Sequence, residues 1–212
     1  MGSCFITLEG VEGAGKSTLR DALALKFGAL NQELILTREP GATAIGRRLR
    51  EILLDPQNTQ LAPLAELMLF CADRAQHVAE VIQPGLKRGS IVICDRYIHS
   101  TLAYQGYARG LALDKLNSLM DFVTNGLLPD VVLLLDLDPA LGLARVQTRE
   151  SGPTKHDRIE ELALDFHRRV RQGFLAMAQA DEKRFILLDA TLDAETLAER
   201  AFSEVTKRIK VS

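Results

Sequence analysis

The chain has 212 residues, with 26 basic and 28 acidic side chains, so its formal net charge is −2. Hydrophobic residues make up 47% and charged residues 25%, an ordinary globular composition that excludes a disordered chain. No apolar run approaches the roughly 18 residues of a membrane span, and the first residues lack a secretory signal pattern, so we expect a cytoplasmic protein. The three cysteines have no paired spacing and predict neither a disulfide framework nor a structural zinc site.

Short apolar runs alternate with longer helical periods along the chain. The runs are continuously apolar, as in parallel strands buried on both faces, and lie at residues 4–8, 33–37, 91–94, 131–136 and 185–188. Apolar residues recur at helical spacing at Leu19, Leu23 and Phe27, and again within residues 45–54, 64–82, 114–125 and 197–209. The pattern predicts an α/β fold with a five-stranded parallel sheet flanked by helices, in a single domain over residues 1–212. Ligands of such sheets bind beyond the carboxyl ends of the strands.

The first predicted strand is followed by a phosphate-binding loop. Residues 10–17 match G-x-x-x-x-G-K-[ST] without deviation, between a strand and a helix. The glycines let backbone N–H groups turn inward around a phosphate, and the next helix points its positive end at the same anion. Lys16 is predicted to reach the outer phosphates, and the Ser17 hydroxyl to ligate Mg²⁺. The motif predicts a three-layer P-loop NTPase fold that binds a nucleoside triphosphate through Gly10, Val11, Glu12, Gly13, Ala14, Gly15, Lys16, Ser17 and Thr18.

Two later segments favour a kinase of small molecules. Asp95 and Arg96 follow the predicted strand 91–94, where a carboxylate is expected to bind Mg²⁺ and an arginine to hold phosphate. Residues 145–158 carry several cations around a Ser-Gly-Pro break and predict a lid over the triphosphate. Those cations are Arg145, Arg149, Lys155 and Arg158. The guanine-reading Asn-Lys-x-Asp of a GTPase is absent from the sequence.

Further segments, in order along the chain, are more specific than the P-loop. They include Thr-Arg-Glu-Pro-Gly at 37–41 and Ala-Tyr-Gln-Gly at 103–106, with others at 70–77, 95–97, 135–136, 157–160 and 189–190. On these residues the chain resembles bacterial thymidylate kinases, of the P-loop nucleoside monophosphate kinase family, over nearly its whole length. The resemblance implies phosphoryl transfer from ATP to dTMP with Mg²⁺ as cofactor, giving ADP and dTDP for dTTP biosynthesis. It also implies a homodimer, formed through helices 64–82 and 114–125, and no nucleic-acid partner.

The resemblance further implies a dTMP pocket beside the P-loop. Its residues would be Glu12, Arg38, Glu39, Arg50, Phe70, Arg74, Arg96, Thr101, Tyr104 and Gln105. Phe70 would stack on thymine, and Arg74, one helical turn later, would donate to a thymine carbonyl. Tyr104 would exclude a ribose 2′-hydroxyl, and Glu12 would accept from the deoxyribose 3′-hydroxyl. From the pattern alone, Phe70 is a core residue of its helix and Arg74 a solvated one.

The catalytic arginine is expected to come from the lid. The P-loop has no basic residue before Lys16, so the resemblance assigns this role to Arg145 or Arg149, beside Lys16 and Arg96. The chain departs from the family pattern at Ala42 and His99, to which we assign no function. We expect His99 to be an exposed helix residue near the mouth of the pocket.

Two other functions fit parts of the sequence. A different nucleotide or deoxynucleoside kinase would share the P-loop and the Asp-Arg pair, but a nucleoside acceptor would need a base to deprotonate its hydroxyl. A P-loop switch with slow ATPase activity would need no acceptor at all. Acceptor-dependent release of ADP separates these alternatives from a dTMP kinase.

Overall fold

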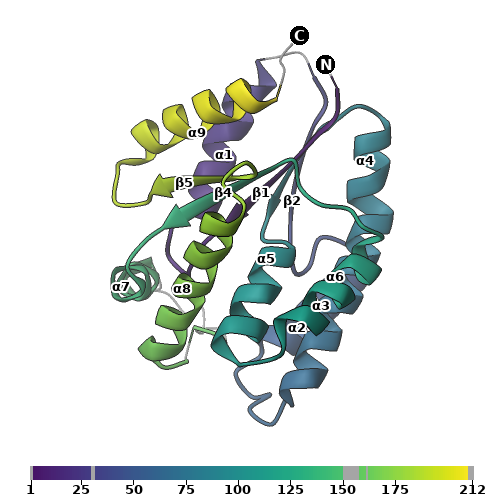
Figure 1. Cartoon of the computed structure of the whole chain (residues 1–212), viewed down its shortest axis with the longest axis vertical. Coiled ribbons are helices and arrows are strands. Elements are labelled where there is room, and N and C mark those ends of the chain that lie inside the picture. The colour runs from purple at the N-terminus through teal and green to yellow at the C-terminus, as the bar shows by residue number, and fades with distance from the viewer. Residues whose placement is uncertain (1, 30–31, 150–157, 161, 210–212) are drawn as a thin grey trace.

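The computed structural model describes residues 2–29, 32–149, 158–160 and 162–209 of the chain. At its centre lies a parallel sheet of five strands in the order β2-β3-β1-β4-β5 (Figure 1). The strands are β1 (Cys4–Glu9), β2 (Leu34–Arg38), β3 (Ile91–Asp95), β4 (Val131–Asp136) and β5 (Phe185–Asp189). The predicted α/β class with five parallel strands is confirmed.

Three strands end one residue later than their apolar runs predict. The added residues are Glu9, Asp95 and Asp189, and β2 is shifted by one residue relative to the predicted range 33–37. The backbone ladder continues past the last apolar side chain, because Asp95 still pairs with Leu8 in the register of β1 and β3. The sheet itself therefore holds these carboxylates at its carboxyl edge.

Helices cover both faces of the sheet (Figure 1). On one face α1 (Lys16–Gly28) packs against α9 (Ala194–Arg208). The helices of the other side are α2 (Ala44–Leu54), α3 (Pro63–His77), α4 (Gln83–Lys87), α5 (Ile98–Thr101), α6 (Leu113–Thr124) and α8 (Leu164–Ala180). Helix α7 (Pro139–Arg149) follows β4. No helix in the described part of the chain is both long and apolar enough to cross a bilayer.

The predicted helix 64–82 is α-helical as far as His77 and π-helical in its last five residues. Helix α3 ends at His77, a π-helical turn η1 (Val78–Ile82) follows, and α4 continues to Lys87. Pro84 has no N–H to donate to the preceding turn, which accounts for a widened turn directly before it. A second π-helix, η2 (Leu102–Ala108), continues α5 along the cavity described below.

The other predicted helices are confirmed within a few residues at each end. Thr43 and Asp193 cap α2 and α9 by accepting from the backbone N–H of Gly46 and Thr196. Helix α6 ends at Thr124 because Asn125 adopts a left-handed conformation with φ of 52°.

The buried apolar side chains form two clusters. Ile6 packs in one cluster with Phe27 of α1, and Phe5 packs in the other with Ile82 of η1. Successive residues of β1 thus point to opposite faces, as the pleat of a strand requires. This double burial explains why the strands read as continuously apolar, and it leaves the carboxyl edge of the sheet for polar side chains.

Candidate active site

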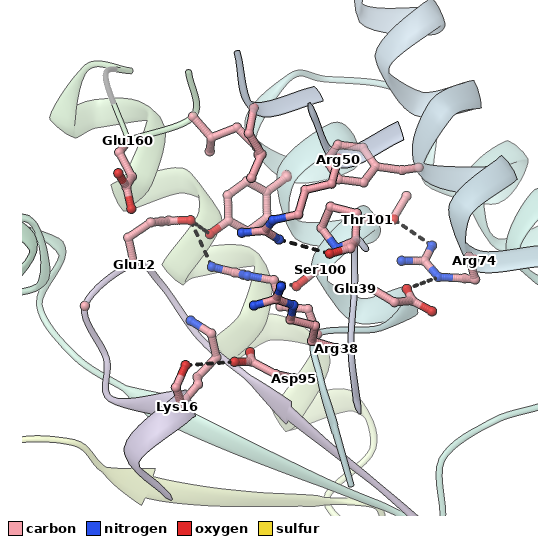
Figure 2. A pocket seen from close by; sticks show the side chains of 18 of the residues that line it. Glu12, Lys16, Arg38, Glu39, Arg50, Arg74, Asp95, Ser100, Thr101 and Glu160 are labelled. Atoms are coloured by element: carbon pink, nitrogen blue, oxygen red, sulfur yellow. Dashed lines mark hydrogen bonds and ion pairs between the residues drawn. The ribbon is translucent and has the colours of Figure 1, made fainter. Parts of the chain in front are cut away.

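A cavity of about 280 Å³ lies at the carboxyl edge of the sheet (Figure 2). All ten residues that the resemblance assigns to dTMP line it, together with Lys16, Ser17 and Asp95. Further side chains line it without a role predicted from the sequence, namely Arg20, Pro40, Leu54, Ser100, Val146, Ile159 and Glu160. The fold therefore gathers most of the predicted site residues in one place.

The P-loop connects β1 to α1 through three glycines in the left-handed half of backbone space. Gly13 has a φ of +68° and packs so closely on Gly142 of α7 that a Cβ atom would lie 2.0 Å from the Gly142 carbonyl oxygen. Lys16 folds back over the loop and donates from Nζ to the carbonyls of Gly10 and Val11, at 3.0 and 2.8 Å. Burial, and then the charge of Arg96, lowers the pKa of Lys16 to about 8, against the attraction of Asp95 and the other carboxylates.

The Glu12 carboxylate is the centre of a buried polar cluster (Figure 2). Its Oε1 accepts from Arg96 Nη2 at 2.9 Å and from the Tyr104 hydroxyl at 2.5 Å. Its Oε2 is 3.1 Å from Nδ1 of His167, a residue without a role predicted from the sequence. Burial opposes ionisation, but Arg96, His167, Lys16 and Tyr104 together hold the pKa of Glu12 well below its ordinary value. Glu12 is therefore an ionised acceptor inside the P-loop.

Ser17 and Asp95, the two predicted magnesium ligands, contact each other beside the P-loop. The Ser17 hydroxyl donates to Asp95 Oδ2 at 3.2 Å, and both side chains line the cavity. Hydroxyl and carboxylate oxygens are the hard donors that Mg²⁺ prefers in phosphate sites. The donor set therefore fits a magnesium ion held beside a triphosphate.

Arg74 is a buried cation, which corrects the solvated position expected from the pattern alone. Its Nε donates to Glu39 Oε2 at 2.8 Å, and both side chains are 3% exposed. Its other donors reach Thr101 Oγ1, Met120 sulfur and the Tyr97 carbonyl. Four of its five N–H groups are thus engaged within the described part of the chain, which leaves one for a ligand.

Glu39 joins the end of β2 to α3 through two residues of that helix, Arg74 and His77. Its Oε1 lies 2.9 Å from His77 Nδ1, and His77 Nε2 lies 2.6 Å from Thr37 Oγ1. Among the described residues, Glu39, His77 and Cys94 form one group of potential metal ligands within reach of a common ion. Their ligand atoms are occupied by protein partners, and burial raises the pKa of the Cys94 thiol well above its ordinary value. We therefore interpret the group as a hydrogen-bonded core cluster.

Two arginines at the cavity come from the end of β2 and from α2. Arg38 is the last residue of β2 and is exposed, whereas Arg50 donates from Nη1 to the Pro40 carbonyl at 3.0 Å. Gly41 has a φ of +106°, and a Cβ atom there would lie 2.8 Å from Arg50 Cδ. The loop after β2 thus needs a glycine to let Arg50 lie against it.

Glu66 is another buried carboxylate, and it contacts Gln105, which lines the cavity. It accepts from Gln105 Nε2 at 2.9 Å, from Arg109 in a bidentate pair, and from Arg158. Arg158 also donates from Nε to the Leu53 carbonyl at 3.1 Å. The structure thus shows Arg158, predicted as one of the lid cations, as an anchor between α2 and α3.

Of the two predicted catalytic arginines of the lid, the structure describes the side chain of Arg145 alone. Arg145 lies on α7 and donates from Nη1 to the Ala190 carbonyl at 3.1 Å, and it is not among the residues that line the cavity. The side chain of Arg149 and residues 150–157, including Lys155, lie outside the described residues.

The expectation that His99 is an exposed residue near the pocket mouth is wrong. His99 is buried, does not line the cavity, and packs edge-on against the Phe185 ring with centroids 4.9 Å apart. Burial lowers the pKa of His99 to about 3, helped by the positive charge of Arg184. His99 is therefore a neutral core residue at physiological pH.

Glu9, which the sequence did not single out, contacts Ser100, one of the residues that line the cavity. It is fully buried and accepts from the Tyr97 backbone N–H at 2.9 Å and the Ser100 hydroxyl at 2.6 Å. Burial raises the pKa of Glu9 to about 7, although those two hydrogen bonds and the charges of Arg96 and Lys16 lower it. The folded protein therefore disfavours the ionised form of this carboxyl group.

We predict that Glu9→Gln alters the pH dependence of stability. The pKa of Glu9 is raised from 4.5 to about 7 on folding. Ionisation of Glu9 therefore lowers the free energy of unfolding of the wild-type protein as the pH rises through this window, and the loss is complete above pH 7. Glutamine cannot ionise, so the unfolding free energy of the variant relative to wild type should rise by about 3 kcal/mol across that window. Urea unfolding at pH 4.5, 6 and 7.5 measures this difference. The exposed Glu199→Gln is the control, and a difference that stays constant with pH would contradict the prediction.

The chain is similar to known thymidylate kinases in both sequence and structure. The thymidylate kinase family model matches residues 8–201 of the chain. A thymidylate kinase of Deinococcus radiodurans is 50% identical over 204 residues, covering 96% of this chain and 97% of the relative. A thymidylate kinase of Synechococcus is 47% identical over 210 residues, covering 98% and 97%. The crystal structure of a thymidylate kinase from Ehrlichia chaffeensis superposes with a TM-score of 0.80 at 30% identity, covering 97% of this chain and all of that one.

Proposed function

Because this chain belongs to the thymidylate kinase family, we propose that its cavity binds dTMP and that the adjoining P-loop binds the triphosphate of ATP. The chain is a kinase that transfers a phosphoryl group from ATP to dTMP, giving ADP and dTDP. The observation that carries the site assignment is the single cavity that joins the P-loop to all ten expected dTMP residues. The product would feed dTTP biosynthesis.

The contacts within the cavity suggest what each end of dTMP meets. Phe70 offers a ring for the thymine base, and Arg74 retains one N–H for a thymine carbonyl after its protein contacts are counted. Thr101 and Gln105 complete the base end of the site. Glu12 would accept from the deoxyribose 3′-hydroxyl, and Tyr104, hydrogen-bonded to Glu12, would leave no room for a 2′-hydroxyl.

Catalysis would rest on positioning and on neutralising charge. ATP and dTMP together carry about six negative charges at neutral pH. Lys16, Arg38, Arg50 and Arg96 supply the opposing charge at the cavity, with Arg145 or Arg149 to be added from the lid. The attacking phosphate oxygen is already ionised, so no general base is needed. The residues would hold donor and acceptor in line and stabilise the charge of the transferring group.

We propose that Mg²⁺ is the cofactor and that Ser17 and Asp95 hold it. Their oxygens already lie 3.2 Å apart beside Lys16, and they provide the oxygen donors this ion prefers. When bound, Mg²⁺ neutralises and orients phosphate oxygens. Ser17 would provide a ligand directly, and Asp95 directly or through water.

The chain is further proposed to form one domain over residues 1–212, with a lid at about 145–158. It would act as a cytoplasmic homodimer without a nucleic-acid partner. Exposed apolar side chains support the dimer through the predicted helices, since Leu64 and Met68 of α3 and Phe122 of α6 are all exposed.

The test is ADP release with a panel of acceptors: dTMP, dUMP, UMP, AMP, GMP and thymidine. We expect dTMP to be the best acceptor, UMP to be poor because of its 2′-hydroxyl, and thymidine to be inactive because it lacks the phosphate whose ionised oxygen is the attacking group. EDTA should abolish turnover with dTMP. ADP release without an acceptor would favour a P-loop switch, and turnover of thymidine would favour a deoxynucleoside kinase.

A further inference from the structure

His167 is a buried histidine that the proposed function leaves without a role. It lies on α8, its side chain is 1% exposed, and its Nδ1 is 3.1 Å from Glu12 Oε2. Its other nitrogen, Nε2, is buried without a hydrogen-bond partner among the described residues. One side of the ring therefore contacts the P-loop carboxylate, and the other side contacts no polar group.

The hydrogen bonds of Glu12 show what this contact does. Each carboxylate oxygen has two lone-pair directions. On Oε1 both are taken, by Arg96 at 2.9 Å and by Tyr104 at 2.5 Å. On Oε2 the contact with His167 takes one. Among the described residues, the second lone pair of Oε2 is the acceptor position left for a ligand in the cavity.

The direction of the hydrogen bond between His167 and Glu12 follows from the chemistry of the carboxylate. Glu12 is ionised and can only accept, so Nδ1 of His167 must carry a hydrogen. His167 therefore donates to Glu12 through Nδ1.

Helix α8, which carries His167, packs closely against η2. A Cβ atom on Gly173 would lie 2.6 Å from the Tyr107 ring, so α8 and η2 are in close contact. The neighbouring Phe166 packs between the Arg109 guanidinium, 5.4 Å from its centroid, and the Tyr104 ring at 6.1 Å. His167 and Tyr104 thus approach Glu12 from two helices that are packed against each other.

We propose that His167 is a positioning residue for the acceptor nucleotide: it holds Oε2 of Glu12 so that the free lone pair faces the 3′-hydroxyl of the deoxyribose. This inference rests on the proposed function, in which Glu12 accepts that hydroxyl. His167 itself does not touch the substrate.

The test compares dTMP with its 3′-deoxy analogue, which lacks the hydroxyl. The readout is the ratio of kcat/KM for the two acceptors, because it isolates the contact with Glu12. His167→Leu removes the donor, and the ratio should fall about tenfold, through a raised KM for dTMP with the KM for ATP unchanged. His167→Asn has nearly the same shape as leucine and places an N–H where Nδ1 lies, so it should keep the ratio within about twofold of wild type.

Two further variants separate a failure of this inference from misfolding and from a failure of the proposed function. His167→Gln moves the donor away from Glu12 while keeping a polar side chain, and it replaces the leucine variant if thermal unfolding shows that variant to be unfolded. Glu12→Gln tests whether Glu12 accepts the 3′-hydroxyl. It should lower the ratio of kcat/KM for dTMP and its 3′-deoxy analogue at least as much as His167→Leu. If Glu12→Gln lowers the ratio and the leucine and glutamine variants at 167 do not, the inference is overturned and the proposed function stands. If Glu12→Gln leaves the ratio unchanged, Glu12 does not accept the 3′-hydroxyl, and both that part of the proposed function and the inference about His167 are overturned.

Discussion

Replacement of Arg96 by alanine is expected to lower kcat by a factor of roughly 10²–10³ while the protein stays folded. Arg96 donates from Nη1 to the Gly10 carbonyl and the Ser100 hydroxyl, both at 3.2 Å, and from Nη2 to Glu12 at 2.9 Å. It follows the strand that carries Asp95, so its charge lies between the P-loop and the proposed acceptor site. Loss of the side chain removes a fixed positive charge from the proposed point of phosphoryl transfer.

The backbone of Arg96 supports this placement. Its φ of 71° is rare for a residue with a side chain and costs of order 1–3 kcal/mol. Alanine would carry the same backbone conformation without the contacts that maintain it. Lysine would keep the charge, but a single ammonium cannot reproduce the forked contacts to Gly10, Ser100 and Glu12. Arg96→Lys should therefore also lose most of the rate.

Steady-state kinetics with dTMP measure kcat of each variant, and circular dichroism shows whether the variant is folded. Arg88→Ala is the matched control, since Arg88 is exposed and pairs with Glu33 away from the cavity. Its kcat should remain within about twofold of wild type. A folded Arg96→Ala enzyme with near-normal turnover would remove Arg96 from the catalytic machinery.

Replacement of Arg74 by methionine is expected to lower the free energy of unfolding by about 3–5 kcal/mol. Methionine fills much of the same volume, but Glu39 would be left buried without the charge it pairs with at 2.8 Å. The effect on dTMP binding would come in addition, because Arg74 also lines the cavity. This is a large share of the stability of an ordinary domain.

Urea unfolding of a double-mutant cycle tests the origin of that loss. Arg74→Met combined with Glu39→Gln removes both charges, so the pair should recover part of the stability lost in Arg74→Met alone. Arg168→Ala breaks an exposed ion pair with Asp165 and should change the unfolding free energy by less than about 0.5 kcal/mol. Additive effects of the two buried substitutions would contradict a coupled pair.

The elements that could be predicted from the sequence are those with a local signal. The five strands are continuous apolar runs, and the P-loop is a contiguous motif whose neighbours in space are also neighbours in sequence. The dTMP residues were expected from resemblance to a family, and all ten line the cavity. Glu9 was overlooked because it follows the last apolar residue of a strand, where a carboxylate carries no periodic signal.

The sequence by itself thus determined the fold class, the phosphate-binding loop and the family to which the chain belongs. The tertiary structure decided which polar groups are buried and which partners they have. Arg74 meets Glu39 across 35 residues, Arg158 meets Glu66 across 92, and His167 meets Glu12 across 155. A periodic pattern records which face of one element is apolar, but an ion pair between distant elements leaves no trace in either local pattern. Such pairs exist only where the packed fold removes both groups from water, and so only the folded chain shows them.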